Sequence, residues 1–518
     1  MAITDPNDNR IVEDTGANTE KFAGGNLWNF IVKLNNQNTD DANGEFTFPS
    51  SMILELCIEE DLLHWPYKGY MIYDNRLELL ERVEPEYTFR MDGHDELTVS
   101  IELLVKKTNG DDFPEDIWTM NFDFVVYDSE DLPSSNISTK TKKLYFWDKR
   151  YQMMMDKNIE WSTSTDQDPP LTHPALATDK ERSMNTGTAM KSILESGGFE
   201  DFVDDDWSTG GSIIQYVSPA TNSINDDLEY LVNKHIHETS VNGKDFNDVC
   251  VLKIDRATQK LQLKSLSSFF DEAGDTAAKP GDRQRAHLFF EDYAGEGETM
   301  TDPLRAPYGD YADEDQDLYK KDIKMIEWSK ILTYNFVDMA GIDNTNNLIS
   351  RPVYWYDSGN KQFGLDYSDN EITTCKDDFK SLYTSKLLSD GNSSALFTLN
   401  TTKTDQYNIR PTFTQVKDGL FNDGKSRQIL GKGQTLLAGI FLNECMQIRL
   451  LGSTHLEVGT FIGIDRLGGG SKFDMKVCGQ WFVINVKHLL TNNKYITDIT
   501  AIKINTYEDL GITDGEVG

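Results

Sequence analysis

Apolar and polar residues alternate with a period of two along three segments in the first third of the chain. The apolar positions are Leu54, Leu56 and Ile58; Leu97, Val99, Ile101, Leu103 and Val105; and Trp118, Met120, Phe122, Phe124 and Val126. This period places one set of side chains on a buried face and the other toward solvent or a partner. We therefore predict that residues 24–160 form a mostly antiparallel β domain with one strongly apolar face, after a flexible polar arm over residues 1–23.

The pattern changes beyond residue 161, where helical spacing replaces strict alternation. The apolar face of a predicted short helix consists of Met190, Ile193 and Leu194. Gly197 is expected to take the left-handed position at its C-terminus. A second helix is predicted to begin at Ser223, with Asp226 as the partner of a capping box. Its apolar stripe consists of Ile224, Leu228, Leu231, Val232 and His235. Residues 249–266 then predict a hairpin, so residues 161–325 are interpreted as an α/β module.

Strand patterns return in the last third of the chain. The alternating apolar positions are Leu332, Tyr334 and Phe336, and later Met446, Ile448 and Leu450. Residues 473–490 and 494–505 predict a hairpin around Asn492–Asn493. These strands predict a second β domain, built from residues 326–360 and 444–508. An inserted domain over residues 361–443, irregular and polar at first and with a helix over residues 424–443, separates its two parts, and a tail of residues 509–518 follows.

The net charge of the chain indicates which classes of molecule it can bind. The 518 residues carry a formal net charge of −36, with a sequence pI near 4.5. Such a surface repels phosphate backbones, which argues against tight nucleic-acid binding. Two interpretations remain: solubility, including adaptation to a salty habitat, or a surface that lets DNA pass without binding it. Composition alone favours the first.

Cysteine usage and the apolar runs indicate a soluble intracellular folding route. The five scattered cysteines are Cys57, Cys250, Cys375, Cys445 and Cys478, and the sequence has no CxxC pair. An odd, scattered set predicts reduced thiols and folding in a cytoplasm. The first residues lack a basic segment followed by an apolar one, and runs such as residues 436–442 are too short to span a bilayer. We expect a chain that is not exported by the ordinary signal route.

One segment matches a phosphate-binding pattern. Residues 419–426, GLFNDGKS, fit GxxxxGK[ST], in which Lys425 would reach the terminal phosphates and Ser426 would hold magnesium. The preceding segment is polar rather than a buried parallel strand, and no apolar run ending in Asp is placed to hold the metal. We therefore predict a loop before a helix and no cofactor at this segment.

Three other groups raise the question of a metal. His235 and His237 lie two residues apart, so on a helix their imidazoles would point to different sides, and packing is the expected role of His235. The run Asp204–Asp206 and the stretch Gly309–Asp317 both lack the spacing of a calcium loop and are interpreted as solvated turns. We predict no metal site and no cofactor.

Catalytic signatures are also missing from the sequence. With 86 acidic residues, no carboxylate pair stands out as a glycosidase pair. No GxSxG elbow occurs, and no cysteine has a recognisable protease context. We therefore expect a protein that is not an enzyme and has no catalytic residue.

Several longer stretches together resemble a known family. They are residues 56–75 with 89–103, residues 141–158, residues 214–236 with 248–263, and residues 478–505. In order and spacing they resemble the baseplate central hub proteins of T-even-type contractile-tailed phages, which are related to the hub part of type VI secretion spike proteins. The chain departs from that family by extra residues near 270–320 and 361–420, and it stops soon after the last hairpin, so a spike would be a separate subunit.

The resemblance implies a specific fold and role. The fold would be α+β and mostly β, with two tube-type antiparallel β-barrel domains, an α/β module between them and an insertion in the second barrel. Three chains would form a homotrimeric ring of six barrels that adapts a threefold spike to a sixfold tail tube, initiates the tube and lets genomic DNA pass. Expected partners are the spike, the tube or tube-initiator proteins, the tape measure and baseplate wedge proteins. The location would be the virion tail baseplate, after assembly in the host cytoplasm and without stable membrane association.

Two other functions remain open from the residues alone. An acidic β-rich tail protein that binds or cleaves host cell-surface glycans would show a cleft with exposed tryptophans and a carboxylate pair. Trp355 and Trp481 lie within alternating strands and are interpreted as core residues. A nucleotide-driven assembly factor would depend on Lys425 alone.

Overall fold

Strands account for most of the regular structure in the computed structural model. The structure describes residues 28–36, 45–75, 95–103, 119–133, 141–163, 184–211, 213–214, 216–219, 221–241, 244–248, 250–256, 258–270, 284–290, 330–338, 353–357, 362–366, 412–416, 444–452, 456–465, 479–491 and 494–505. Among these residues no helix is long and apolar enough to cross a membrane. The predicted fold class, mostly β with a few helices, is confirmed at this level.

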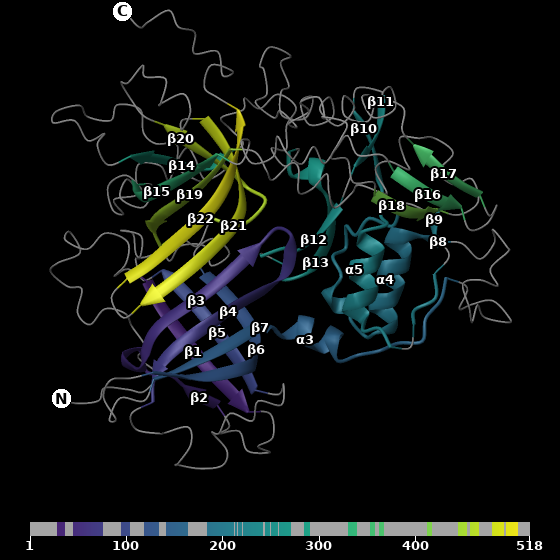
Figure 1. Ribbon diagram of the computed structural model, residues 1–518. Helices are drawn as coiled ribbons and strands as arrows, with labels where there is room; N and C mark the ends of the chain where they lie inside the picture. Colours follow the sequence, from purple (N-terminus) through teal and green to yellow (C-terminus); the bar gives the residue numbers. More distant parts are fainter. Residues whose placement is uncertain are drawn as a thin grey trace, which may run out of the picture.

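The first half of the main sheet has the order β2-β1-β5-β6-β7-β4-β3, with every neighbouring pair antiparallel (Figure 1). Its strands are β1 (Trp28–Asn36), β2 (Glu45–Thr47), β3 (Ile53–Asp61), β4 (His64–Asp74), β5 (Asp95–Leu103), β6 (Thr119–Leu132) and β7 (Thr141–Asp148), and the short 3-10 helix η2 (Ser50–Met52) precedes β3. The predicted alternation holds in β5 and β6, whose described apolar positions are buried on one face. It fails at Leu54 of β3, which is 37% exposed, where the ladder with β4 shifts register between Ile53 and Glu55. An antiparallel sheet of this kind can cover one face and leave the other to solvent.

The second half of the sheet closes on itself. Its hydrogen-bonded order is β21-β20-β14-β15-β19-β22, and β22 returns to pair with β21. The strands are β14 (Gln284–Phe290), β15 (Lys330–Asp338), β19 (Glu444–Leu451), β20 (Phe461–Asp465), β21 (Gly479–Thr491) and β22 (Lys494–Asn505). β14 pairs in parallel with β15 and β20, and the other pairs are antiparallel. The predicted hairpin of β21 and β22 around Asn492–Asn493 is confirmed.

One ladder joins the two halves into a single 13-stranded sheet. β3 pairs antiparallel with β21 over seven register positions, from Glu55 opposite Thr491 to Asp61 opposite Asn485. Residues more than 400 positions apart in the sequence thus become direct neighbours. In Figure 1 the yellow β21 lies beside the purple β3, and β22 lies on the other edge of β21.

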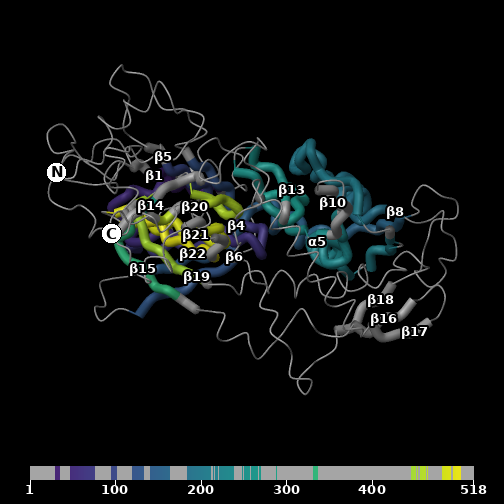
Figure 2. Tube along the Cα trace, turned by 90° about the horizontal axis from the view of Figure 1, so that it is seen from above, coloured from purple at the N-terminus to yellow at the C-terminus, as the bar shows by residue number. Residues whose placement is uncertain are grey.

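The α/β module lies to one side of the sheet (Figures 1 and 2). Its helices are α3 (Lys149–Met155), α4 (Thr186–Ser196) and α5 (Ile224–Val232), with 3-10 turns η6 (Glu200–Phe202) and η7 (Leu266–Phe270). Its strands are β8 (Met184–Asn185), β9 (Ile213–Ile214), β10 (His237–Val241), β11 (Lys244–Asp248), β12 (Cys250–Ile254) and β13 (Leu261–Ser265). The predicted capping box of Ser223 and Asp226 starts α5, and β12 with β13 forms the predicted hairpin.

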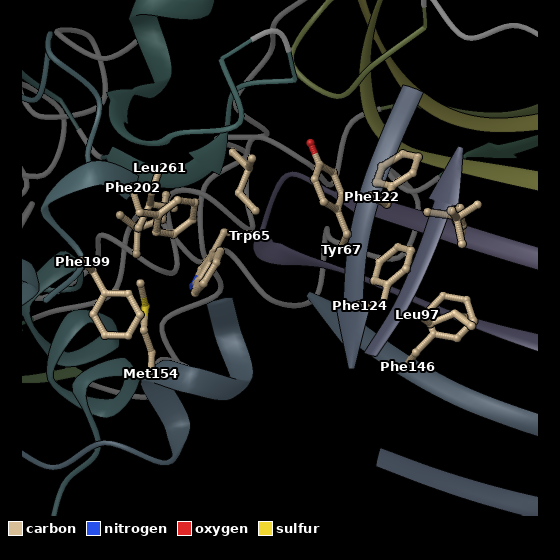
Figure 3. Packing of buried hydrophobic residues seen from close by; sticks show 14 of the residues in the cluster. Trp65, Tyr67, Leu97, Phe122, Phe124, Phe146, Met154, Phe199, Phe202 and Leu261 are labelled. Carbon is tan, nitrogen blue, oxygen red and sulfur yellow. The ribbon is translucent and has the colours of Figure 1, made fainter. Parts of the chain in front are cut away.

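Tight packing joins the module to the first half of the sheet. One continuous buried cluster contains residues of both, and a second cluster fills the closed half. Trp65 on β4 lies between the two parts, with its ring 5.4 Å from that of Tyr151 and 6.2 Å from that of Phe202 (Figure 3). Such aromatic contacts hold the module against the sheet.

The structure corrects several sequence-based expectations. Gly197 has a right-handed φ of −78°, and Gly198, at φ +78°, takes the left-handed position at the end of α4. β14 comes from the segment interpreted as part of the α/β module, yet it pairs within the closed half of the main sheet. β16 (Val353–Asp357), expected in the second β domain, pairs instead with β17 (Gln362–Asp366) and β18 (Thr412–Val416) in a separate sheet, so the region expected to be irregular contains two strands. The helix predicted over residues 424–443 lies outside the described residues.

Gly69 on β4 offers a test of the packing between β4 and its neighbours β3 and β7. A Cβ there would lie 2.1 Å from the carbonyl oxygen of Cys57 and 2.7 Å from the ring of Phe146. We expect Gly69→Ala to lower the free energy of unfolding by about 1–3 kcal/mol, because the strand and the ring must move apart. Gly210→Ala is the matched control, since a Cβ at Gly210 meets no atom within 4 Å. Equal urea midpoints for the two variants would contradict the described packing.

Candidate functional site: a buried charged joint between the sheets and the module

A network of charged side chains lies where the two halves of the sheet and the module meet. Glu60 comes from β3, Arg256 from the turn after β12, and His488 from β21. Their exposed fractions are 3%, 12% and 0%. Charged groups are rarely this buried unless they are paired, so the residues around them must compensate for the lost water.

Strand alternation turns Glu60 inward. On β3 the side chains of Leu56 and Ile58 point into the core, and Glu60 follows them at the same period. The neighbouring Glu59 is partly exposed on the opposite face, where it pairs with Lys487 at 3.3 Å. The acidic stretch thus divides between two faces of the sheet, and only Glu60 enters the interior.

Arg256 ties Glu60 to two other segments. Its Nη2 donates to Glu60 Oε1 and, at 2.8 Å, to the carbonyl oxygen of Leu456. Its Nε lies 3.9 Å from Glu457 Oε2, and Lys253 Nζ on β12 lies 3.9 Å from Glu457 Oε1. One guanidinium thereby connects β3, the β12–β13 hairpin and the loop before β20.

His488 completes the network from the second half of the sheet. Its Nδ1 lies 2.7 Å from the hydroxyl of Tyr495, and its Nε2 lies 3.5 Å from Glu60 Oε1. Tyr495 is fully buried, and its ring fills the space above Gly452, where a Cβ would lie 2.0 Å away. The pair fixes β21 against β22 at the point where β21 also meets β3.

The charges in the network determine one another. Burial alone would raise the pKa of Glu60, but Arg256 and the contact with His488 lower it to about 2. Burial would lower the pKa of Arg256, but Glu60 and Glu457 raise it. Burial lowers the pKa of His488 below its usual value, which outweighs the attraction of Glu60. At neutral pH the joint is a carboxylate–guanidinium pair with a neutral imidazole beside it.

A polar face lies on the other side of the same ladder. A shallow cavity of about 470 Å³ spans β15, β19, β22, β21 and β3, so both halves of the sheet line it. Arg449 binds Asp498 through two hydrogen bonds of 2.7 and 2.6 Å. Tyr334, one of the alternating apolar positions of the predicted strand, is 42% exposed there. Arginine and aromatic residues are enriched at contact surfaces between proteins.

The candidates from the sequence have different outcomes. The prediction that the rings of His235 and His237 point to different sides assumed that both residues lie on a helix. Both residues follow the end of α5 at Val232, so this prediction was wrong, and the rings stack with centroids 6.4 Å apart. Burial and the neighbouring His237 lower the pKa of His235 to about 3. Trp481 is fully buried, as expected of a core residue. The absence of a metal, a cofactor and a catalytic residue stays a prediction.

The acidic candidates form no shared site among the described residues. Asp204 is buried and accepts hydrogen bonds from the backbone N–H of Asp206 and from Gln262, while the exposed Asp205 pairs with Lys260. The stretch Gly309–Asp317 and the segment with Lys425 and Ser426 lie outside the described residues, and nothing is described of the side chain of Trp355.

Replacing Arg256 tests whether the joint holds the parts together. We expect Arg256→Met to lower the free energy of unfolding by about 3–5 kcal/mol, because it leaves Glu60 charged, buried and unpaired. The matched control is Arg449→Met, which removes an exposed pair and should cost at most about 1 kcal/mol. The double variant Glu60→Met/Arg256→Met should recover most of the loss in urea denaturation. A double variant as unstable as the single one would contradict the pairing.

The pH dependence of stability tests the state of His488. An unfolded imidazole titrates near pH 6.5, whereas burial lowers the pKa in the folded chain, so the unfolded state binds more protons below pH 6.5. The contribution of His488 is therefore complete above pH 6.5 and is lost as the pH falls below it. Unfolding at pH 7.5 and pH 5.5 should show a smaller stability difference for His488→Gln than for the unchanged chain. The exposed His64→Gln should keep the full difference.

The solved structures similar to this chain include phage tail proteins and type VI secretion components. No protein-family model matches the chain, and no curated protein matches it. A tail protein from Neisseria meningitidis is similar in structure at 10% identity, over 93% of this chain and 98% of that one, with a TM-score of 0.43. A 43 kDa tail protein of prophage MuSo2 from Shewanella oneidensis is similar at 10% identity, over 91% of this chain and 98% of that one, with a TM-score of 0.41. A type VI secretion component of Escherichia coli, described as similar to phage T4 tail proteins, is similar at 9% identity. The match covers 87% of this chain and 73% of that one, with a TM-score of 0.34.

Proposed function

We propose that the chain is the structural central hub of a contractile phage tail baseplate. Three copies would form a ring that adapts a threefold spike to the sixfold tail tube and lets DNA pass through its centre. The observation that carries the proposal is the β3–β21 ladder, which sets two sheet-built halves side by side within one chain. Three such chains supply six sheet-built units, which is the number that a sixfold tube requires.

The order of the elements supports this assignment. The stretches that resemble hub proteins form β3 to β5, β7 with α3, α5 with the β12–β13 hairpin, and β21 with β22. The closed half is built as a ring of six paired strands, in keeping with one tube-type barrel. We assign the seven-stranded half to the other.

The buried joint supports a mechanical role. A hub must transmit force from the tube to the spike without bending between its parts. Arg256 contacts Glu60 of one half and the Leu456 segment of the other, and the module that carries Arg256 packs against the first half through Trp65. Buried charge pairs are costly to rearrange, so this arrangement opposes hinge motion between the halves.

The acidic balance supports the passage of DNA. A chain with a net charge of −36 contributes a negative field to any channel that three copies enclose, and phosphate backbones do not bind to such a wall. Spike, tube and wedge proteins would attach through broad surfaces. The polar face around Tyr334, with the exposed Leu332 on the same strand, is one surface of suitable composition.

The oligomeric state tests the proposal. Mass photometry of the purified chain, alone and mixed with the spike protein of the same phage, should give particles of three times the chain mass of 58.9 kDa in at least one of the two samples. Assays on host polysaccharide should show no cleavage, and filter binding at low salt should retain no DNA. A stable monomer in both samples, or a monomer that cleaves polysaccharide, would reject the hub in favour of a glycan-directed tail protein.

A further inference from the structure

Three residues with metal-binding side chains meet at the edge of the module. His235 lies in the turn after α5, His237 is the first residue of β10, and Cys250 is the first residue of β12. Their ligand atoms all lie within 4.8 Å of one another. The three positions surround the base of the β10–β11 hairpin, which is seen at the upper edge of the module in Figure 1.

The ring of His235 is held in place on one side and leaves one nitrogen unpaired. The ring is 4% exposed, its Nδ1 lies 2.8 Å from Thr186 Oγ1, and its Nε2 is buried without a hydrogen-bond partner. If Nδ1–H donates to Thr186, the lone pair of the neutral ring lies on Nε2, the atom that is left for a ligand. Gly211, at φ +99°, packs against the ring so closely that a Cβ would lie 2.4 Å from it. The orientation of the imidazole is therefore fixed before any ion binds.

The other two residues are placed to complete the set. Cys250 is a free thiol that is 4% exposed, and it lines a cavity of about 230 Å³ together with Trp65 and Val232. His237 is half-buried and lies opposite the fully buried Asp248 in the β10–β11 register. A carboxylate beside a ligand histidine is a common way to orient the ring.

The ligand chemistry selects the ion. Two imidazole nitrogens and one thiolate suit zinc, whereas calcium and magnesium prefer oxygen. With Zn–N near 2.0 Å and Zn–S near 2.3 Å, tetrahedral ligand atoms lie roughly 3.3–3.6 Å apart. The three side chains therefore have to close by about 1 Å, which small side-chain rotations provide.

In contrast to the sequence-based prediction of no metal site, we propose that His235, His237 and Cys250 bind one Zn²⁺ ion that clamps the base of the β10–β11 hairpin to the end of α5. The fourth position is taken by water. Binding replaces the S–H proton of Cys250, which leaves to solvent, with a Zn–S bond, and no oxidation or reduction takes place. The site is structural, because it lies on the module and joins three segments of the chain.

Cobalt substitution tests the site directly. The purified full-length chain, stripped with a chelator and titrated with Co²⁺, should bind one ion per chain and develop both a thiolate-to-cobalt charge-transfer band and the strong visible bands of tetrahedral cobalt. Zn²⁺ should then displace the cobalt and abolish the spectrum. Elemental analysis of the zinc-loaded chain should give one zinc per chain after dialysis.

Single substitutions distinguish this site from ions held by the many surface acids. Cys250→Ser should remove the charge-transfer band, whereas Cys445→Ser, on β19 of the closed half, should keep it. His237→Gln should weaken Co²⁺ binding at least tenfold while circular dichroism stays unchanged, and the exposed His64→Gln should have no effect. Failure of the unchanged chain to develop the charge-transfer band, or a band that survives Cys250→Ser, would overturn the proposal.

Discussion

The seven-position ladder between β3 and β21 is the constraint on which the rest of the structure depends. It joins the segment near residue 58 to the segment near residue 488, so this one strand pairing unites the two halves into the 13-stranded sheet. Pairings of such large sequence separation carry a large entropic cost of loop closure, which must be offset by contacts on both faces. Here the inward face contributes the Glu60–Arg256 joint, and the outward face contributes the Glu59–Lys487 pair.

The joint explains why a charged group occupies a core position. An apolar residue in place of Glu60 would satisfy the alternation of β3 equally well, and replacement of a buried pair by apolar residues is often neutral for stability. The pair adds directional hydrogen bonds. Arg256 donates to Glu60 and to the carbonyl oxygen of Leu456 at the same time, which requires the module and the two halves of the sheet to keep this arrangement. The proposed hub function would require a fixed arrangement of this kind.

The sequence predicts the local structure well and the long-range structure poorly. The strands around Leu97 and Phe122, the capping box at Ser223 and the final hairpin all follow from period and turn chemistry, which act within a few residues. The place of β14 in the closed half depends on its parallel partners, which no local pattern reveals. Glu60 carried one visible signal, an acidic residue on the apolar period of Leu56 and Ile58. The proximity of His235 and His237 was missed because helical spacing was assumed for both residues, whereas α5 ends at Val232.

The proposed function requires that each chain hold two sheet-built units in a fixed relation and that three copies close a ring around an acidic channel. Electron cryomicroscopy of the purified assembly, alone or bound to its spike, tests that claim most directly. The account predicts a threefold particle with six sheet-built units at one level around a central opening, two from each chain, joined through the β3–β21 ladder. A particle without threefold symmetry, or one in which the two halves of a chain lie at different levels along the axis, would contradict it.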